Sequence, residues 1–383
     1  MRVRSDRTQT RWAAIGLVIV GLAGAACKTT RPTADAGAVD AAASGQPPTD
    51  AAIAVDGGEA SADGGTSSAV PRYPDNAVWL THDYTAYASF VAMVPDLATR
   101  MSRSYGVTTL LPSVGTIGAQ GTLSSGPSLS SSFLDAVGSW EQANGAHLRV
   151  LPWFSGPTDS VDLTNVAVQT AIRGECKKLL LPAASGSYVA TATRPFDGVV
   201  LDFEPSGLDA TRFAALIAII DGIHSDVPQA KVGVAAHALG TGDRYHWAPD
   251  FYAQMARHAD LVFAMTYDSG SANAAAYQTW MQSQVPSILD AIATGNGQPR
   301  AGFRLFIGFP AYPGSTYHLV AAETVAAAAA GTRAALTQLA AAHDPAAGWF
   351  AGASVYLHTD GSGSDGYAGW TTDWASFAAT WLQ

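Results

Sequence analysis

Beyond about residue 71, short apolar runs alternate with longer segments in which apolar residues recur at helical spacing. The short runs are rich in Val, Leu, Ile and aromatic residues, and such near-continuous apolarity is typical of parallel strands covered on both faces. We predict eight strands, at residues 77–81, 107–112, 148–153, 198–203, 231–236, 261–267, 305–309 and 353–357.

Helical patterns lie between the predicted strands. The clearest covers residues 209–225, and Asp209 is a suitable N-cap for it. The Ala-rich segment 322–342 predicts another helix. The apolar residues that share one face of the first helix are Phe213, Leu216, Ile217, Ile220 and Ile223.

Eight strand-then-helix units in about 310 residues predict the α/β class and a single (β/α)8 TIM barrel over residues 72–383. The competing architecture is a doubly wound open sheet. That fold would be expected to carry a Gly-rich phosphate turn after an early strand, and the sequence has none there.

The pattern before the barrel is different. Residues 28–71 are mainly Ala, Gly, Asp, Ser, Thr and Pro, which bury too little surface to fold, so we expect a disordered tether. Residues 12–26 form an apolar stretch behind four arginines, as in an export signal peptide over residues 1–27. This stretch is shorter than the roughly 20 residues of a membrane span.

The apolar stretch ends in Leu-Ala-Gly-Ala-Ala-Cys at residues 22–27, which resembles a bacterial lipoprotein cleavage box. The resemblance implies that Cys27 is lipidated and that a lipid is the only membrane anchor. Lys28 follows in place of an acidic residue, which implies an outer-membrane lipoprotein, facing the periplasm or the cell surface. The alternative is an ordinary signal cut after Ala26, which would release a secreted protein.

Composition excludes some function classes. Hydrophobic residues make up 48% of the chain, which is enough for a large core, and we expect a monomer. The net charge of −10 and the lack of a basic run argue against a nucleic-acid partner. If Cys27 carries lipid, Cys176 has no disulfide partner, and we expect it to be an unreactive thiol.

The side chains that suggest chemistry lie at the ends of predicted strands, where function collects in such barrels. Asp202 and Glu204 are two residues apart and therefore face the barrel axis, whereas Leu201 and Phe203 face the helices. Two close carboxylates cannot both ionise cheaply, so one pKa should rise and provide a proton donor. The alternative is an acidic strand end that is solvated or paired with an arginine.

Three segments resemble family-18 glycoside hydrolases, the chitinase-like family. Residues 197–204 are similar to Asp-Gly-x-Asp-x-Asp-x-Glu, residues 264–268 to Met-x-Tyr-Asp, and residues 307–312 to Gly-x-Pro-x-Tyr. Val200 departs from the usual Asp, and Phe203 from the common Trp. The residues of the first motif that match are Asp197, Gly198, Asp202 and Glu204.

The resemblance implies retaining, substrate-assisted cleavage of N-acetylglucosamine-containing glycans of the chitin or peptidoglycan type. Glu204 is then the general acid and base, Asp202 orients the acetamido group, and Tyr267 donates a hydrogen bond to its carbonyl. Neither a cofactor nor a metal is implied. The expected substrate contacts are Asp268, Trp153, Tyr312, Tyr356 and Asp197.

Several departures leave the substrate open. The third strand lacks the family's Ser-x-Gly-Gly, and Tyr356 stands where the family has a Trp as the floor of the sugar pocket. Val200 removes a charge beside Asp202, which predicts a shifted acid limb in the pH profile. Two alternatives remain, a non-catalytic glycan-binding protein of lectin type and a structural lipoprotein of the cell envelope.

Overall fold

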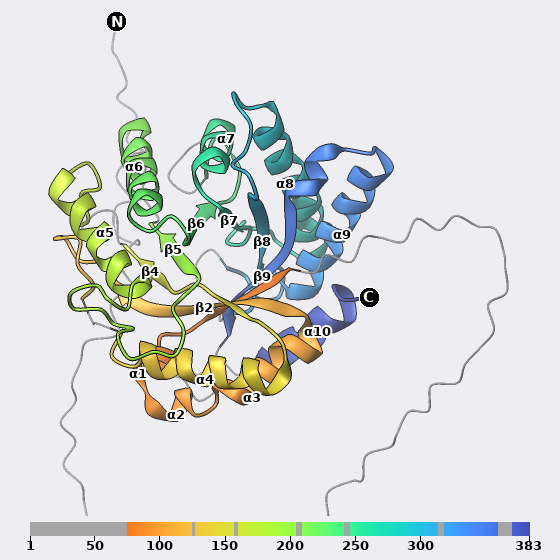
Figure 1. Ribbon diagram of the computed structural model, residues 1–383. Coiled ribbons are helices and arrows are strands. Elements are labelled where there is room, and N and C mark those ends of the chain that lie inside the picture. The colour runs from red at the N-terminus through yellow and green to blue at the C-terminus, as the bar shows by residue number, and fades with distance from the viewer. Residues whose placement is uncertain are drawn as a thin grey trace, which may run out of the picture. The chain divides into compact units, whose positions relative to one another are not determined.

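The structure is a computed structural model that describes residues 75–383, apart from 125–126, 157–159, 204–208, 241–245, 313–317 and 359–369. Its described strands form one closed parallel barrel (Figure 1). The strands are β1 (Asn76–Leu80), β2 (Val107–Thr116), β3 (Arg149–Val150), β4 (Trp153–Ser155), β5 (Gly198–Asp202), β6 (Lys231–His237), β7 (Leu261–Met265), β8 (Arg304–Pro310) and β9 (Phe350–His358).

The barrel closes because β1 pairs in parallel with both β2 and β9. The short strands β3 and β4 together fill the third position, since each pairs with β2. Pro152 lies between them and has no N–H to donate, which interrupts the strand. Its carbonyl still accepts a hydrogen bond from Val200 N at 2.8 Å. Within the described residues the barrel therefore has eight strand positions, and the predicted (β/α)8 barrel is confirmed.

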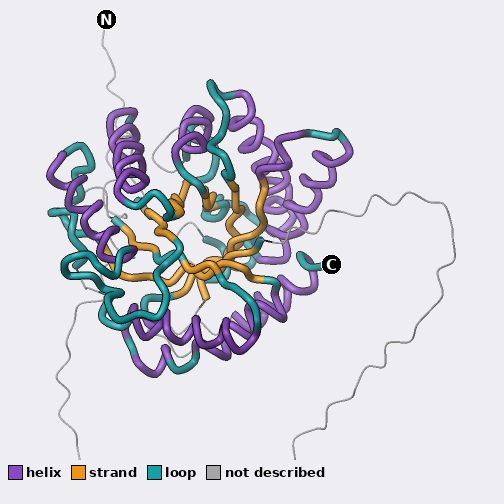
Figure 2. The backbone as a smooth tube through the Cα atoms, in the orientation of Figure 1, coloured by secondary structure: helices purple, strands orange, loops and turns teal. Residues whose placement is uncertain are grey.

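Helices surround the strands on the outside of the barrel (Figure 2). Asp209 caps α6 by accepting a hydrogen bond from Arg212 N, as the sequence predicts. The helices are α1 (Asp83–Ala86), α2 (Ala88–Val91), α3 (Val94–Thr99), α4 (Ser130–Asn144), α5 (Val166–Leu180), α6 (Ala210–Asp226), α7 (Pro249–His258), α8 (Ala274–Thr294), α9 (Val325–Ala341) and α10 (Trp370–Thr380), with the π-helix η1 (Arg100–Ser104) and the 3-10 helix η2 (Pro345–Trp349).

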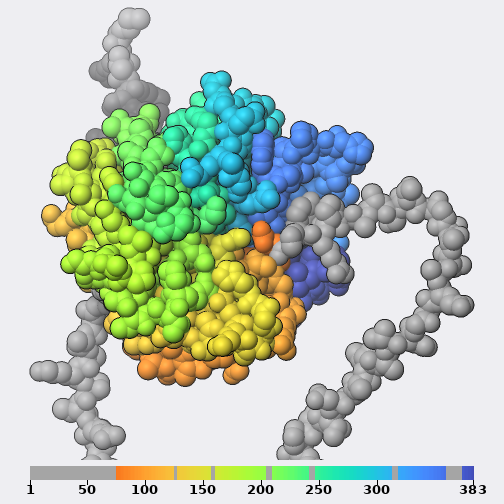
Figure 3. Space-filling model, in the orientation of Figure 1, coloured from red at the N-terminus to blue at the C-terminus, as the bar shows by residue number. Residues whose placement is uncertain are grey.

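The core has two layers. Leu201 and Phe203 belong to the layer between strands and helices, as predicted, whereas Val200 belongs to the layer inside the barrel. In the space-filling view, successive segments follow one another around the surface from yellow-green through cyan to blue (Figure 3). The inner layer consists of Ala77, Trp79, Leu111, Leu151, Val200, Ala235, Leu261, Phe263, Phe306 and Ala351.

The predicted signal peptide, Cys27 and the tether lie outside the described residues. In the part that is described, none of the helices is both long and apolar enough to span a membrane. Cys176 on α5 is fully buried and forms no disulfide there. Burial raises the pKa of its thiol far above the usual range, as expected for an unreactive cysteine.

Candidate active site

Most of the predicted site residues gather at the carboxyl ends of the strands. Because all the strands are parallel, these ends open on the same side of the barrel, which we call the mouth. The residues at the mouth are Asp202 at the end of β5, Tyr267 and Asp268 after β7, Tyr312 after β8, Trp153 in β4 and Tyr356 near the end of β9.

Asp202 lies on the inner face of β5, in line with Val200 beneath it, and the residue is only 8% exposed. Its carbonyl accepts a hydrogen bond from Gly156 N at 3.0 Å. A Cβ on Gly156 would lie 2.1 Å from the ring of Phe203, so the close approach of this segment to β5 requires glycine. Glu204, the predicted proton donor, lies outside the described residues.

Three tyrosines are in mutual ring contact at the mouth. Tyr267 stacks on Tyr356, with centroids 5.5 Å apart, and meets Tyr312 edge-on at 5.5 Å. Tyr312 and Tyr356 meet edge-on at 5.4 Å. We call these three residues the tyrosine cluster. They form a continuous aromatic wall, which is the kind of surface that packs against the apolar face of a sugar ring.

One tryptophan supports this wall from the barrel interior, and a second tryptophan packs against the first. Trp79 is 3% exposed and meets Tyr356 at 5.8 Å and Trp153 at 5.4 Å, both edge-on. The Nε1–H of Trp153 donates to the carbonyl of Leu80 at 3.3 Å. Trp79 thus has a packing role, while Trp153 is only partly buried and lies closer to the mouth.

Asp268 is the exposed acidic group beside the tyrosine cluster. The hydroxyl of Tyr312 donates to its Oδ1 at 2.8 Å. Burial, and then the nearby Asp268 carboxylate, raise the pKa of Tyr312 far above its usual value. Tyr312 therefore stays protonated, as a hydrogen-bond donor, at any pH at which the protein would work.

Two residues that the sequence analysis did not assign to the site complete this region. Glu323, 1% exposed, and His318, 3% exposed, lie behind Asp268. The ligand atoms of the three side chains are within 4.8 Å of one another, which would fit a metal site. However, the two oxygens of Glu323 already accept four hydrogen bonds from protein groups. The arrangement is therefore that of a hydrogen-bonded support, with few lone pairs left for an ion.

Asp197 is not brought together with the other predicted residues. It precedes β5 at the amino end, where its carboxylate accepts hydrogen bonds from Val150 N at 2.7 Å and from Arg194 at 2.5 Å. Because a strand rises about 3.3 Å per residue, five residues separate Asp197 from Asp202 by about 16 Å. The side chain connects β3 to the start of β5. Asp197 therefore lies at the end of the barrel opposite the mouth, where the predicted contact with substrate does not fit.

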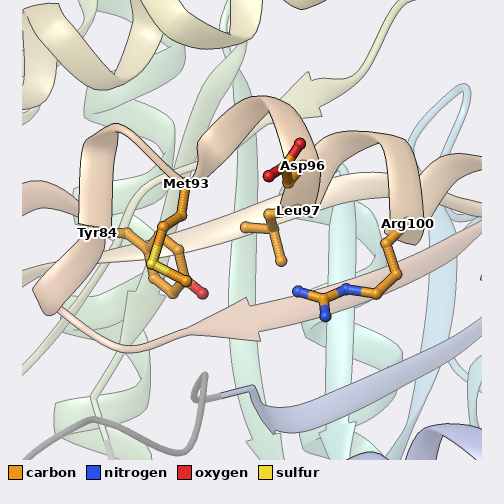
Figure 4. A pocket seen from close by; sticks show the side chains of 5 residues that line it. All are labelled: Tyr84, Met93, Asp96, Leu97 and Arg100. Carbon is orange, nitrogen blue, oxygen red and sulfur yellow. The ribbon is translucent and has the colours of Figure 1, made fainter. Parts of the chain in front are cut away.

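A cavity of about 320 Å³ lies beside α1 and α3. Figure 4 shows the side chains that line it. Tyr84, which lines it, is fully buried and stacks on His358 at the end of β9, with centroids 6.3 Å apart. None of the predicted site residues lines this cavity. The residues that do are Tyr84, Met93, Asp96, Leu97 and Arg100.

Comparison with known proteins finds solved structures of similar fold. No family model matches the sequence, and a search of curated proteins finds no match. The C-terminal domain of a candidate chitinase from Desulfitobacterium hafniense DCB-2 is similar, with a TM-score of 0.50 and 16% identity over 80% of this chain and 99% of that one. A fungal endo-β-N-acetylglucosaminidase of glycosyl hydrolase family 18 gives a TM-score of 0.50 and 14% identity, over 80% and 96% of the two chains.

A xylanase and α-amylase inhibitor from Scadoxus multiflorus is also similar, with a TM-score of 0.49 and 15% identity over 80% of this chain and 97% of that one. At such low identities the similarity is one of fold. The chain has the barrel fold of the chitinase-like proteins of glycosyl hydrolase family 18.

Proposed function

We propose that this protein is a glycoside hydrolase that cleaves N-acetylglucosamine-containing glycans. The observation that carries the proposal is that Asp202 and the tyrosine cluster lie on the same side of the barrel, at the carboxyl ends of its parallel strands. The aromatic wall can bind a sugar ring, and the carboxyl group and the phenol can act on the substituents of that ring during cleavage of its glycosidic bond. The similarity of fold to a family-18 endo-β-N-acetylglucosaminidase supports the same chemistry.

In the proposed mechanism the acetamido group of the substrate is the nucleophile. Asp202 accepts a hydrogen bond from the acetamido nitrogen, and Tyr267 donates its hydroxyl to the acetamido oxygen, on which charge develops. Glu204, two residues beyond Asp202, protonates the leaving oxygen and then activates water. Asp268 and Tyr312 bind sugar hydroxyl groups, while Trp153 and Tyr356 pack against sugar rings.

The substrate we propose is chitin or peptidoglycan, and the location is the bacterial envelope. A lipid on Cys27 and a tether over residues 28–71 would hold a monomeric barrel close to the glycan. Detergent-phase partitioning of the full chain and of Cys27→Ala tests the anchor. Loss of partitioning only in the variant is the expected result.

Cleavage is tested on N-acetylglucosamine oligomers and on purified peptidoglycan, with product masses read by mass spectrometry. Because a general acid contributes about 10²- to 10⁴-fold, Glu204→Gln should lower kcat by that factor, and Asp202→Asn should also reduce kcat. Asp290→Asn, an exposed aspartate on α8, is the matched control and should be fully active.

A non-catalytic glycan-binding protein of the same fold is the alternative. The signature's inner Asp is absent at Val200, but Asp202, Glu204 and Tyr267 are all present in the sequence, which supports the hydrolase instead. Tight binding of glycan with no released product, by the wild type and by Glu204→Gln alike, would establish the alternative.

A further inference from the structure

The backbone turns sharply just after Tyr267, and it does so at a residue that is not glycine. Asp268 has φ = 55°, in the left-handed region that non-glycine residues rarely adopt. Two residues later the chain does use glycine for such a conformation, since Gly270 has φ = 67°. A side chain at position 268 is therefore kept although glycine would form the turn more easily.

Glu323 holds this turn from behind. Its Oε2 accepts the backbone N–H of Asp268 at 2.8 Å, and its Oε1 accepts the backbone N–H of Ser269 at 2.7 Å. The hydroxyl of Ser269 donates to the same Oε1 at 2.6 Å. The two oxygens of one carboxylate thus bind consecutive amides, which fixes the orientation of the peptide between Asp268 and Ser269.

Glu323 is ionised in spite of its burial. Burial alone would raise its pKa, but hydrogen bonds from His318, Ser269 and the two amides outweigh that effect and lower the pKa. The residue lies just before α9, 55 positions after Asp268 in the sequence. A buried anion aimed at the backbone of a strand end is costly unless all its donors stay in place.

His318 connects Glu323 to the tyrosine cluster. Its Nδ1–H donates to Oε2 of Glu323 at 3.0 Å, and its ring stacks on Tyr312, with centroids 4.1 Å apart. Tyr312 in turn donates to the carboxylate of Asp268. The contacts form a closed circuit, Glu323 to His318 to Tyr312 to Asp268 and back to Glu323. The circuit restrains both the main chain and the side chain of Asp268.

We propose that Glu323 and His318 are positioning residues, which hold Asp268 and the neighbouring Tyr267 in the geometry that binds the sugar. This proposal rests on the proposed glycosidase function. Neither residue needs to touch substrate, since Glu323 contacts the turn from the buried side. The left-handed turn places the acidic side chain against the hydroxyl of Tyr312 in the tyrosine cluster, and the carboxylate of Glu323 makes that conformation stable.

The first test is Glu323→Gln. The side chain of glutamine has an NH₂ group in place of one carboxylate oxygen, and this group cannot accept a hydrogen bond. The two hydrogen bonds that this oxygen accepts in the wild type are therefore lost. Displacement of the turn by about 1 Å should lower kcat by about 100-fold, more than it changes KM. Glu175→Gln is the matched control, because Glu175 is also buried and hydrogen-bonded but lies on α5, away from the mouth. It should leave kcat unchanged.

Two variants of His318 separate its contacts. His318→Phe keeps the ring against Tyr312 but loses the hydrogen bond to Glu323, whereas His318→Asn keeps a donor and loses the stacked ring. Both should lower kcat if the circuit acts as a unit. Asp268→Asn completes a double-mutant cycle with Glu323→Gln, and asparagine can adopt the positive φ of this position. If Glu323 acts in part through the carboxylate of Asp268, the two losses should be less than additive, and the loss that remains in the double variant is the part that acts through Tyr267.

Amide hydrogen exchange of the segment 266–271 gives a readout that does not depend on activity. Faster exchange in Glu323→Gln, with the rest of the folded barrel unchanged and no change in Glu175→Gln, is expected. Wild-type kcat in folded Glu323→Gln would overturn the positioning role, and fully additive losses in the cycle would overturn the part of it that acts through Asp268. If the wild type cleaves no glycan, the proposed function fails, and unchanged exchange in Glu323→Gln would then reject the positioning role separately.

Discussion

The rings of Tyr267 and Tyr356 stack with their centroids 5.5 Å apart and their planes inclined by 20°. This contact fixes the plane of the Tyr267 ring, and in the proposed mechanism the hydroxyl at its far end serves a chemical purpose. The packing of the ring and the chemistry of the hydroxyl can therefore be separated by mutation, because phenylalanine retains the first and loses the second.

We predict that Tyr267→Phe lowers kcat by about 10²- to 10³-fold, the usual effect of removing one donor from a developing oxyanion. Thermal stability should change little, since the ring contacts with Tyr312 and Tyr356 remain. Steady-state kinetics on an N-acetylglucosamine oligomer, beside a thermal melt, checks both parts. Full activity in Tyr267→Phe would remove the hydroxyl from the mechanism.

Tyr356 should act as the floor of the sugar pocket, and its ring alone should be sufficient. We predict that Tyr356→Ala raises KM about tenfold, because an aromatic contact contributes about 1 kcal/mol beyond its area and the area itself is also lost. Tyr356→Phe is the matched control and should behave like the wild type. Equal KM values for the alanine and phenylalanine variants would show that the sugar does not pack there.

The main features of the barrel could be predicted from the sequence because they depend on local patterns. The apolar run 198–203 marks β5, and the two-residue repeat of a strand assigns Val200 to the inside and Leu201 to the outside. Asp209 likewise caps α6 through a contact only three residues long. Such features need no knowledge of how distant segments meet.

The support behind Asp268 could not be predicted in this way. Glu323 and Asp268 are 55 residues apart and belong to different barrel units, so neither spacing nor periodicity connects them. For Asp197 the sequence predicted a place in the site that the fold does not give it. Its place in a catalytic signature suggested a substrate contact, but a strand of five residues carries it to the other end of the barrel. A motif gives residue types, whereas the fold decides which of them share a site.

A substitution at Val200 should show how an additional carboxyl group below Asp202 affects stability and the pH dependence of kcat. Val200 is fully buried in the apolar inner layer, below Asp202 and against Gly233. Val200→Asp would bury a carboxyl group there, so its pKa should be raised and the free energy of unfolding should fall by about 2 kcal/mol or more. We expect the acid limb of the kcat profile to shift. Val200→Asn supplies the uncharged control, and identical profiles for all three proteins would contradict the prediction.

Asp260 should make stability depend on pH without affecting catalysis. It lies just before β7, at the end of the barrel opposite the mouth, and is 3% exposed. Burial alone would raise its pKa, but hydrogen bonds from His224, from Val232 N and from Lys231 hold the pKa far below the usual value. The carboxylate therefore contributes stability that is fully present above the unfolded pKa of about 3.9.

Below about pH 4 this contribution is lost progressively as the pH approaches the folded pKa, since the unfolded chain then binds the proton first. Asp260→Asn should cost about 2 kcal/mol at pH 7, the typical contribution of charged hydrogen bonds. The difference in the free energy of unfolding between variant and wild type should narrow at pH 3, while kcat at pH 7 stays the same. Urea unfolding at pH 7, 4 and 3 measures this difference, and a difference that stays constant over this range would mean that the charge of Asp260 is not what stabilises the barrel.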